Sequence, residues 1–176
     1  PFRVSKLINY IKKIKKNRFR FNVVTNNGTL ASNGIHFADA ASFVLSKKID
    51  KIDTSGIKNW FNGKRKGFKE FSGTLKVVYQ KNKILILKNG YSKKDICSIH
   101  IDNDKYLIKD NYEKIVINNS KIFKSNRLAV SIVMKNEIKN ILENKKTKLP
   151  TYKEIHATHY IYTKSLLDNY NMLNKR

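Results

Sequence analysis

The sequence predicts an α+β fold in which helices cover one face of an open, mostly antiparallel β-sheet. The first observation is a run of short alternating segments between Ile49 and Ile117, joined by turns and without helices between them. The second is helical spacing of apolar residues on both sides of this run. The third is the length of 176 residues, which suits one domain with a single core. Together they favour a layer of helices packed on a layer of strands.

The first two elements are predicted to be a helix and a strand. Apolar residues at helical spacing indicate a helix over residues 4–14, which a lysine-rich run then ends. Phenylalanine and valine side chains alternate along residues 19–24, as they do in a strand. The run Asn26-Asn27-Gly28 favours a turn, because Asn and Gly adopt positive φ at little cost.

A second helix is predicted over about residues 34–45. Ser32 or Asn33 is expected to cap its N-terminus, because short polar side chains accept hydrogen bonds from the free N–H groups there. The side of the helix expected to face the core carries Phe37, Ala41 and Val44.

The middle of the chain is predicted to form five or six strands. Clusters of Asn, Asp and Gly separate them, and the turn at residues 80–82 makes a hairpin of its two neighbours. Trp60 and Phe61 are expected in a loop between strands, with one aromatic ring as an anchor. The predicted strands span residues 49–57, 70–79, 83–88, 96–102, 105–109 and 113–117.

Two helices are predicted to close the chain. The last begins after Pro150, where Thr151 and Glu154 form a capping box, and runs to about Asn171. It is expected to contribute Tyr160, Tyr162 and Leu166 to the core. The other helix spans about residues 125–143, and its buried stripe is expected to consist of Leu128, Ile132, Val133, Ile138, Ile141 and Leu142.

The net charge of +24 makes nucleic-acid binding an alternative to consider. Only six of the 37 basic residues are arginine, the residue suited to paired hydrogen bonds with phosphates and bases. The lysines are spread over the whole chain, so a solvated surface is the favoured interpretation. Trp60 and Phe61, beside Lys58 and the basic run 64–66, are the best candidates for stacking on single strands.

Cys97 is the only cysteine, which excludes an intrachain disulfide and a site made of several thiolates. No stretch approaches the roughly 18–20 apolar residues of a membrane span, and no cleavable signal peptide is visible. We therefore expect a cytoplasmic protein. His156 and His159 have a spacing found in metal sites, but no third ligand accompanies them, so no metal is expected.

Four segments resemble one enzyme family. Residues 28–45 read G-x-x-x-S-x-G-x-H-x-x-D at their start, which resembles the G-x-x-x-(D/C/S)-x-G-x-H-x-x-D segment of the glucose–fructose oxidoreductase / inositol dehydrogenase (Gfo/Idh/MocA-like) family. The remaining three resemble a G-T strand pair, a helix ending in Leu-Pro and the start of the family's closing helix. They lie at residues 71–87, 138–150 and 151–159.

The resemblance implies that residues 18–176 form a substrate-binding and oligomerisation domain with the dihydrodipicolinate-reductase-like fold of the family's C-terminal half. Residues 1–17 would then form a lead-in helix that links it to an N-terminal Rossmann domain. NAD or NADP would be held mainly by that domain, since this chain contains no G-x-G-x-x-G motif. The implied substrate is a sugar, nucleotide sugar or cyclitol, and a homo-oligomer would form through the open sheet face.

His36 is the catalytic acid/base residue that the resemblance implies. An imidazole with an ordinary pKa near 6.5 exchanges protons with a substrate hydroxyl at physiological pH. Asp39, one helical turn further on, shares its helix face and can orient the ring or raise its pKa. The implied substrate contacts are Ser32, Asn33, Asp39 and His159, and Ser32 stands where many members carry Asp.

Three other interpretations stay open at this point. His36 at the start of a helix can have a purely structural role, in which it binds a loop carbonyl. The domain can be a catalytically silent oligomerisation domain. It can also be a basic nucleic-acid-binding module, although the spread of the lysines disfavours this.

Overall fold

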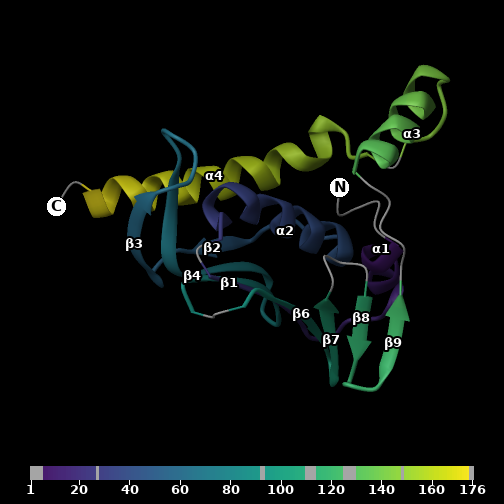
Figure 1. Ribbon diagram of the computed structural model, residues 1–176, viewed down its shortest axis with the longest axis horizontal. Helices are drawn as coiled ribbons and strands as arrows, with labels where there is room; N and C mark the ends of the chain where they lie inside the picture. Colours follow the sequence, from purple (N-terminus) through teal and green to yellow (C-terminus); the bar gives the residue numbers. More distant parts are fainter. Residues whose placement is uncertain are drawn as a thin grey trace.

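The computed structural model describes residues 6–26, 28–91, 94–109, 114–124, 130–147 and 149–174. Four helices and nine strands occur in these ranges (Figure 1). In chain order they are α1 (Lys6–Lys13), β1 (Phe19–Thr25), α2 (Leu30–Leu45), β2 (Lys51–Asp53), β3 (Ile57–Asn62), β4 (Lys69–Gln80), β5 (Lys83–Asn89), β6 (Ile96–Ile101), β7 (Asp104–Lys109), β8 (Lys114–Ile117), β9 (Lys121–Lys124), α3 (Val130–Leu142) and α4 (Tyr152–Asn174).

The strands form one sheet in the order β2-β4-β5-β1-β6-β7-β8-β9, and β3 pairs with β4 beside β2. The predicted hairpin is present, with β4 and β5 antiparallel. Every pairing is antiparallel except that of β1 with β5, which run parallel because β1 is inserted between β5 and β6. The predicted α+β class, with an open and mostly antiparallel sheet, is therefore confirmed.

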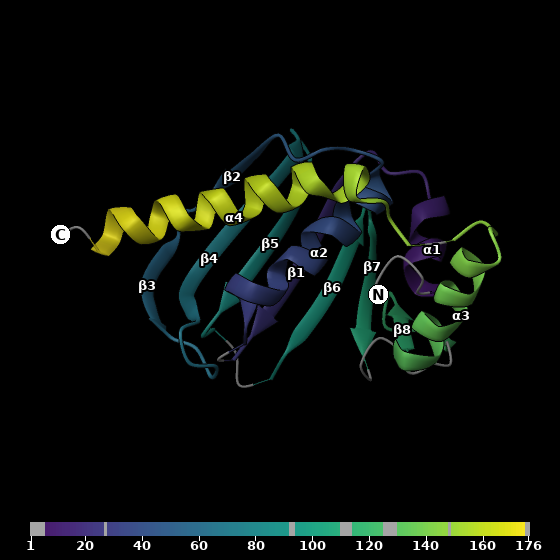
Figure 2. The same cartoon turned by 90° about the horizontal axis from the view of Figure 1, so that it is seen from above.

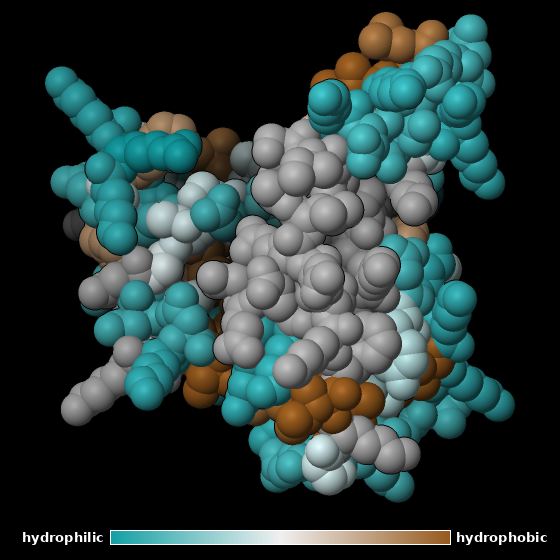
Figure 3. Space-filling view, turned by 45° about the vertical axis from the view of Figure 1, so that its right-hand side comes forward, coloured by the Kyte–Doolittle hydropathy of each residue, from teal (hydrophilic) through white to brown (hydrophobic). Residues whose placement is uncertain are grey.

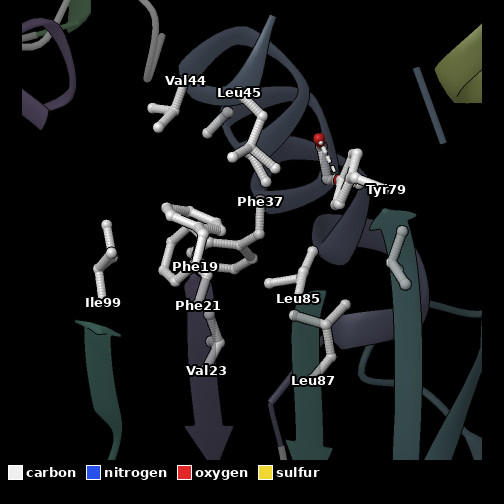
Figure 4. Close-up of a cluster of buried hydrophobic side chains, with 14 of the residues drawn as sticks. Phe19, Phe21, Val23, Phe37, Val44, Leu45, Tyr79, Leu85, Leu87 and Ile99 are labelled. Atoms are coloured by element: carbon white, nitrogen blue, oxygen red, sulfur yellow. Dashed lines mark hydrogen bonds between the residues drawn. The ribbon is translucent and has the colours of Figure 1, made fainter. Parts of the chain in front are cut away.

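Helices α2 and α4 cover one face of this sheet (Figure 2). Alternation along β1 turns Phe19, Phe21 and Val23 toward that face, where all three are buried. They meet Phe37 of α2, whose ring lies edge-on to that of Phe21 with 5.9 Å between the centroids. Figure 4 shows this cluster between β1, β5 and α2, with Leu85 and Leu87 contributed by β5. The core thus fixes α2 against the middle of the sheet.

The aromatic residues Trp60 and Phe61 lie in strand β3 and not in a loop, which corrects the prediction. The single strand predicted over residues 49–57 is likewise two, β2 and β3, which both pair with β4. Trp60 is held by α4, since its indole N–H donates to Oδ1 of Asn169 at 2.9 Å. Asn169 lies more than 100 residues away in the sequence, so local alternation could not predict this contact of the ring with α4.

Helix α3 does not bury the apolar stripe predicted for it. Ile138 and Ile141 are half exposed and Leu142 is 78% exposed, whereas Glu137 is buried and accepts a hydrogen bond from Thr147 at 2.7 Å. The reason is its position, because α3 lies at the β8 and β9 end of the sheet, apart from α2 and α4 (Figures 1 and 2). Strand β9, which precedes it, was not predicted. Three further residues of the predicted stripe are not among those that the structure describes, namely Leu128 and the side chains of Ile132 and Val133.

Helix α4 begins as predicted. Thr151 Oγ1 accepts the backbone N–H of Glu154 at 3.3 Å, and Glu154 accepts the backbone N–H of Thr151 at 2.6 Å, so the capping box is confirmed. The helix continues to Asn174, slightly beyond the predicted end. Two of the three residues expected in the core, Tyr162 and Leu166, are buried. The third, Tyr160, is 59% exposed, so its predicted place in the core is wrong.

On the face shown in Figure 3, hydrophilic side chains extend from the described residues, and hydrophobic residues form separate patches. None of the helices described is long and apolar enough to cross a membrane.

The loop between β1 and α2 is fastened by Asn89, which is buried at the end of β5. Its Oδ1 accepts from the Thr25 hydroxyl at 3.0 Å and from the Gly28 N–H at 2.9 Å. Its Nδ2 donates to the carbonyls of Gly28 at 2.9 Å and Phe71 at 2.7 Å. Three of these hydrogen bonds hold Thr25 and Gly28, and the fourth anchors Asn89 to β4, so the segment that leads into α2 is tied to the sheet.

Replacement of Asn89 by Ala is expected to lower the free energy of unfolding by about 3 kcal/mol, because it leaves buried backbone groups without partners. Urea denaturation followed by circular dichroism measures this. The matched control is Asn103→Ala on the exposed β6–β7 turn, expected within about 0.5 kcal/mol of the parent. Equal stabilities for the two variants would contradict the role of Asn89.

Candidate functional site

The N-terminus of α2 is satisfied by a carboxylate from the sheet. The helix begins at Leu30, with Thr29 at the cap position and no side-chain capping bond from it. Glu70 of β4, only 2% exposed, accepts the N–H of Ala31 at 2.6 Å and the hydroxyl of Ser32 at 2.8 Å. A negative group at this end of a helix is favourable, since the free N–H groups and the dipole are positive there.

This arrangement corrects the predicted cap. Ser32 and Asn33 lie inside the first turns of α2, which starts four residues earlier than the predicted Gly34. Asn33 Nδ2 donates to the hydroxyl of Thr29 at 2.5 Å, so both side chains bind local structure. Glu70 was missed by sequence reasoning, although one acidic residue among the apolar residues of a predicted strand is a signal that it has a buried partner.

Helices α2 and α4 approach each other closely at Gly34. The buried hydroxyl of Tyr162 donates to the carbonyl of Leu30 at 2.6 Å. A Cβ on Gly34 would overlap that hydroxyl and also the side chain of Leu87. Burial and the nearby Glu70 carboxylate raise the pKa of Tyr162, so its hydroxyl stays protonated and remains a donor. The second Gly of the motif is therefore required by packing.

Further along α2, contacts with β4 and α4 fix the turn that carries the candidate site. Tyr79 of β4 donates to the carbonyl of Ala38 at 2.8 Å (dashed in Figure 4), and burial raises the Tyr79 pKa above its ordinary value. The hydroxyls of Ser42 on α2 and Thr158 on α4 lie 3.4 Å apart. His159 is the residue that follows Thr158 on α4.

Three of the five predicted site residues, His36, Asp39 and His159, interact electrostatically. His36 is exposed on α2, and His159 and Asp39 both act on its charge. Partial burial lowers the pKa of His36, nearby positive charge that includes His159 lowers it further, and the Asp39 carboxylate acts in the opposite direction. His36 is therefore neutral at neutral pH, the form in which its ring can accept a proton.

The remaining residues are held differently. Ser32 lies one turn before His36 on α2, with its hydroxyl bound to Glu70, and Asn33 is tied to Thr29. His156 lies between the rings of Tyr152 and Tyr160, with centroids 4.9 Å and 6.2 Å away. Within the described ranges, no group of three or more His, Cys, Asp or Glu residues is arranged to hold a metal ion.

No protein-family model and no curated protein matches the sequence. The fold matches solved structures. An oxidoreductase from Thermotoga maritima aligns with TM-score 0.64 and 12% identity over 92% of this chain and 57% of that one. An oxidoreductase from Agrobacterium radiobacter, in complex with NAD+, L-tartaric acid and magnesium, aligns with TM-score 0.56 and 15% identity over 92% of this chain and 58% of that one. A super-repressor mutant of Gal80p from Saccharomyces cerevisiae aligns with TM-score 0.58 and 10% identity over 95% of this chain and 62% of that one.

These likenesses establish the fold. The chain spans 57% to 62% of the length of the three structures, so it corresponds to one part of them. The chain therefore has the fold of that part, which two oxidoreductases share, as the resemblance predicted.

The His36 environment predicts a specific titration pattern. The ring should titrate below its ordinary value of about 6.5. His159→Gln should raise the His36 pKa because it removes positive charge, and Asp39→Asn should lower it further. Proton NMR of the His36 ring across pH 4 to 8 measures the effect. His156→Gln is the control, expected to leave the His36 pKa unchanged, and equal shifts from both His variants would contradict the arrangement.

Glu70→Leu is expected to lower the free energy of unfolding by about 3 kcal/mol, because it leaves the Ala31 N–H and Ser32 hydroxyl without an acceptor. Glu70→Gln can accept the Ala31 N–H with its amide oxygen and donate its amide N–H to the Ser32 hydroxyl. It then loses only the charge at the helix end, so about 1 kcal/mol is expected. Urea denaturation of the two variants distinguishes the contributions: equal losses would assign the effect of Glu70 to its charge alone, and no loss in either variant would show that Glu70 does not stabilise α2.

Proposed function

We propose that this chain is the substrate-binding and acid/base half of an NAD(P)-dependent oxidoreductase that acts on a sugar, nucleotide sugar or cyclitol. The observation that carries the proposal is His36, exposed on α2 beside Asp39 and His159 with a lowered pKa. A neutral imidazole in this position suits proton exchange with a secondary alcohol. The oxidoreductases that share the fold support the same class of reaction.

In the proposed reaction the neutral ring nitrogen of His36 accepts the proton of the substrate hydroxyl. The same histidine, once protonated, returns the proton when the ketone is reduced. A nicotinamide cofactor, when bound, accepts or supplies the hydride. Asp39 stabilises the imidazolium that forms, while His159 and the Asn33 amide offer hydrogen bonds to neighbouring hydroxyls. Ser32 is a weaker candidate for substrate contact, because its hydroxyl is donated to Glu70.

The cofactor does not fit this chain alone. No G-x-G-x-x-G motif occurs in the sequence, and α2 receives the Glu70 carboxylate at its N-terminus, where a pyrophosphate would need free N–H groups. We therefore assign NAD or NADP to an N-terminal Rossmann domain, linked through residues 1–17. The chain covers only 57% to 62% of the structures that it matches, which supports the proposal of such a partner domain. A homo-oligomer through the open sheet face and a cytoplasmic location complete the proposal.

A second candidate function is a catalytically silent assembly domain. One structure with this fold is Gal80p, described as a super-repressor mutant, so the fold is not restricted to proteins described as oxidoreductases. In this chain the Ser32 hydroxyl stands where many members of the resembling family carry Asp. A silent domain would keep the contacts of Glu70, Gly34 and Tyr162, which stabilise α2, and would not depend on the His36 imidazole.

Kinetics of the complete gene product that contains this chain separate the two functions. NAD(P) reduction with a panel of polyols and sugars is expected, and His36→Gln should lower kcat at least about 100-fold. In the parent, alcohol oxidation should slow as pH falls through the lowered pKa of His36, since the protonated ring cannot accept a proton.

The control for that experiment is His156→Gln, which alters an exposed histidine of α4 and should leave kcat unchanged. A His36→Gln enzyme with the parent's kcat and pH profile would exclude the catalytic role. Absence of turnover from the parent on every substrate of the panel would favour the silent domain.

A further inference from the structure

The open face of the sheet carries a group of cations at the start of β1. Alternation places Arg20 and Asn22 on the face opposite to the buried Phe19 and Phe21. The register sets Arg20 beside Ile84 of β5 and beside His100 of β6. Arg20 and His100 therefore lie next to each other on the face that α2 and α4 leave uncovered.

Two turns enclose this group and form a pocket of about 350 Å³, which we call the β1 pocket. The turn between β4 and β5 is joined to the start of β1, because the Phe19 N–H donates to the Asn82 carbonyl at 2.9 Å. The turn between β6 and β7 is joined to the residue before β1, because the Asp102 N–H donates to the Arg18 carbonyl at 3.2 Å. The polar residues that line the pocket include Arg18, Arg20, Asn22, Lys81, His100 and Asp102.

The charges in the β1 pocket are not balanced within the described chain. Three lining residues, Arg18, Arg20 and Lys81, carry permanent positive charge against the single carboxylate of Asp102. That carboxylate already accepts the backbone N–H groups of Arg18 at 2.8 Å and Asn17 at 3.4 Å. Neither arginine forms an ion pair in the described residues.

The use of arginine is the second observation. The chain is rich in lysine, yet two of the three arginines in the described ranges, Arg18 and Arg20, line this pocket, and Arg65 is the third. Guanidinium groups bind phosphate and carboxylate oxygens through paired hydrogen bonds, which an ammonium group does not provide. Burial together with Lys105 and Arg20 lowers the pKa of His100, as expected beside cations that lack a counter-ion.

We propose that the β1 pocket binds the phosphate or carboxylate group of a small anionic molecule. Arg18 and Arg20 hold the anion, Lys81 adds charge from the β4–β5 turn, and the Asn22 amide donates a hydrogen bond. Ile84 offers an apolar wall for a small organic part. The volume lies at the lower end of ligand pockets, about 300–1,000 Å³, and favours a compact anion over a nucleic acid. The site lies across the sheet from His36 and is independent of the proposed reaction.

Titration of the protein with inorganic phosphate, and separately with malonate, tests the proposal at low ionic strength. Isothermal calorimetry should give saturable binding of at least one probe, and the stronger of the two identifies the chemical source of the anion. Arg20→Gln should weaken that binding about tenfold. The His100 ring, followed by NMR, should show a raised pKa when the anion is bound, because the anion favours the protonated ring.

Arg65→Gln is the matched control, since it removes the same charge from the loop between β3 and β4 and should leave binding unchanged. Arg20→Lys keeps the charge but not the paired hydrogen bonds, so weakened binding by this variant supports the site even if Arg20→Gln unfolds. Equal weakening by Arg65→Gln would overturn the proposal in favour of general charge attraction. Saturable binding of a single-stranded oligonucleotide with no binding of either small anion would overturn it too.

Discussion

The close approach of α2 to α4 at Gly34 is the constraint on which the candidate site depends. Only a residue without a side chain lets the Tyr162 hydroxyl reach the carbonyl of Leu30. This contact seats α4 on α2 while the core of β1 and β5 holds α2 from below. His36 and His159, which are more than 100 residues apart in the sequence, interact electrostatically across these two helices. The catalytic proposal therefore rests on a packing detail as much as on the histidine itself.

The two faces of the sheet differ in what they offer. The covered face buries apolar residues and supports α2, whereas the open face carries Arg20, His100 and Lys105 in one row of the register. A homo-oligomer formed through that face would bring these positive charges together, which opposes association unless they are neutralised. An anion in the β1 pocket would supply that neutralisation at one end of the face. Ligand binding and assembly would then be coupled by charge.

The sequence predicted the fold class, the capping box at Thr151 and the strand β1, because each depends on local spacing. It failed where a distant partner decides. Trp60 lies in a strand that pairs with β4, and α2 begins early, where Glu70 accepts the Ala31 N–H. The apolar residues of α3 have helical spacing but no neighbouring layer in the described chain. At the site, residue types pointed to His36, while its proximity to His159 required the structure.

The proposal that this domain is one half of an oxidoreductase can be tested on the coding sequence upstream of Pro1. An in-frame strand, G-x-G-x-x-G turn and helix are expected there, which would hold the dinucleotide. A start codon immediately before Pro1, with no dinucleotide-binding gene product that copurifies with the protein, would contradict the claim and favour a silent domain.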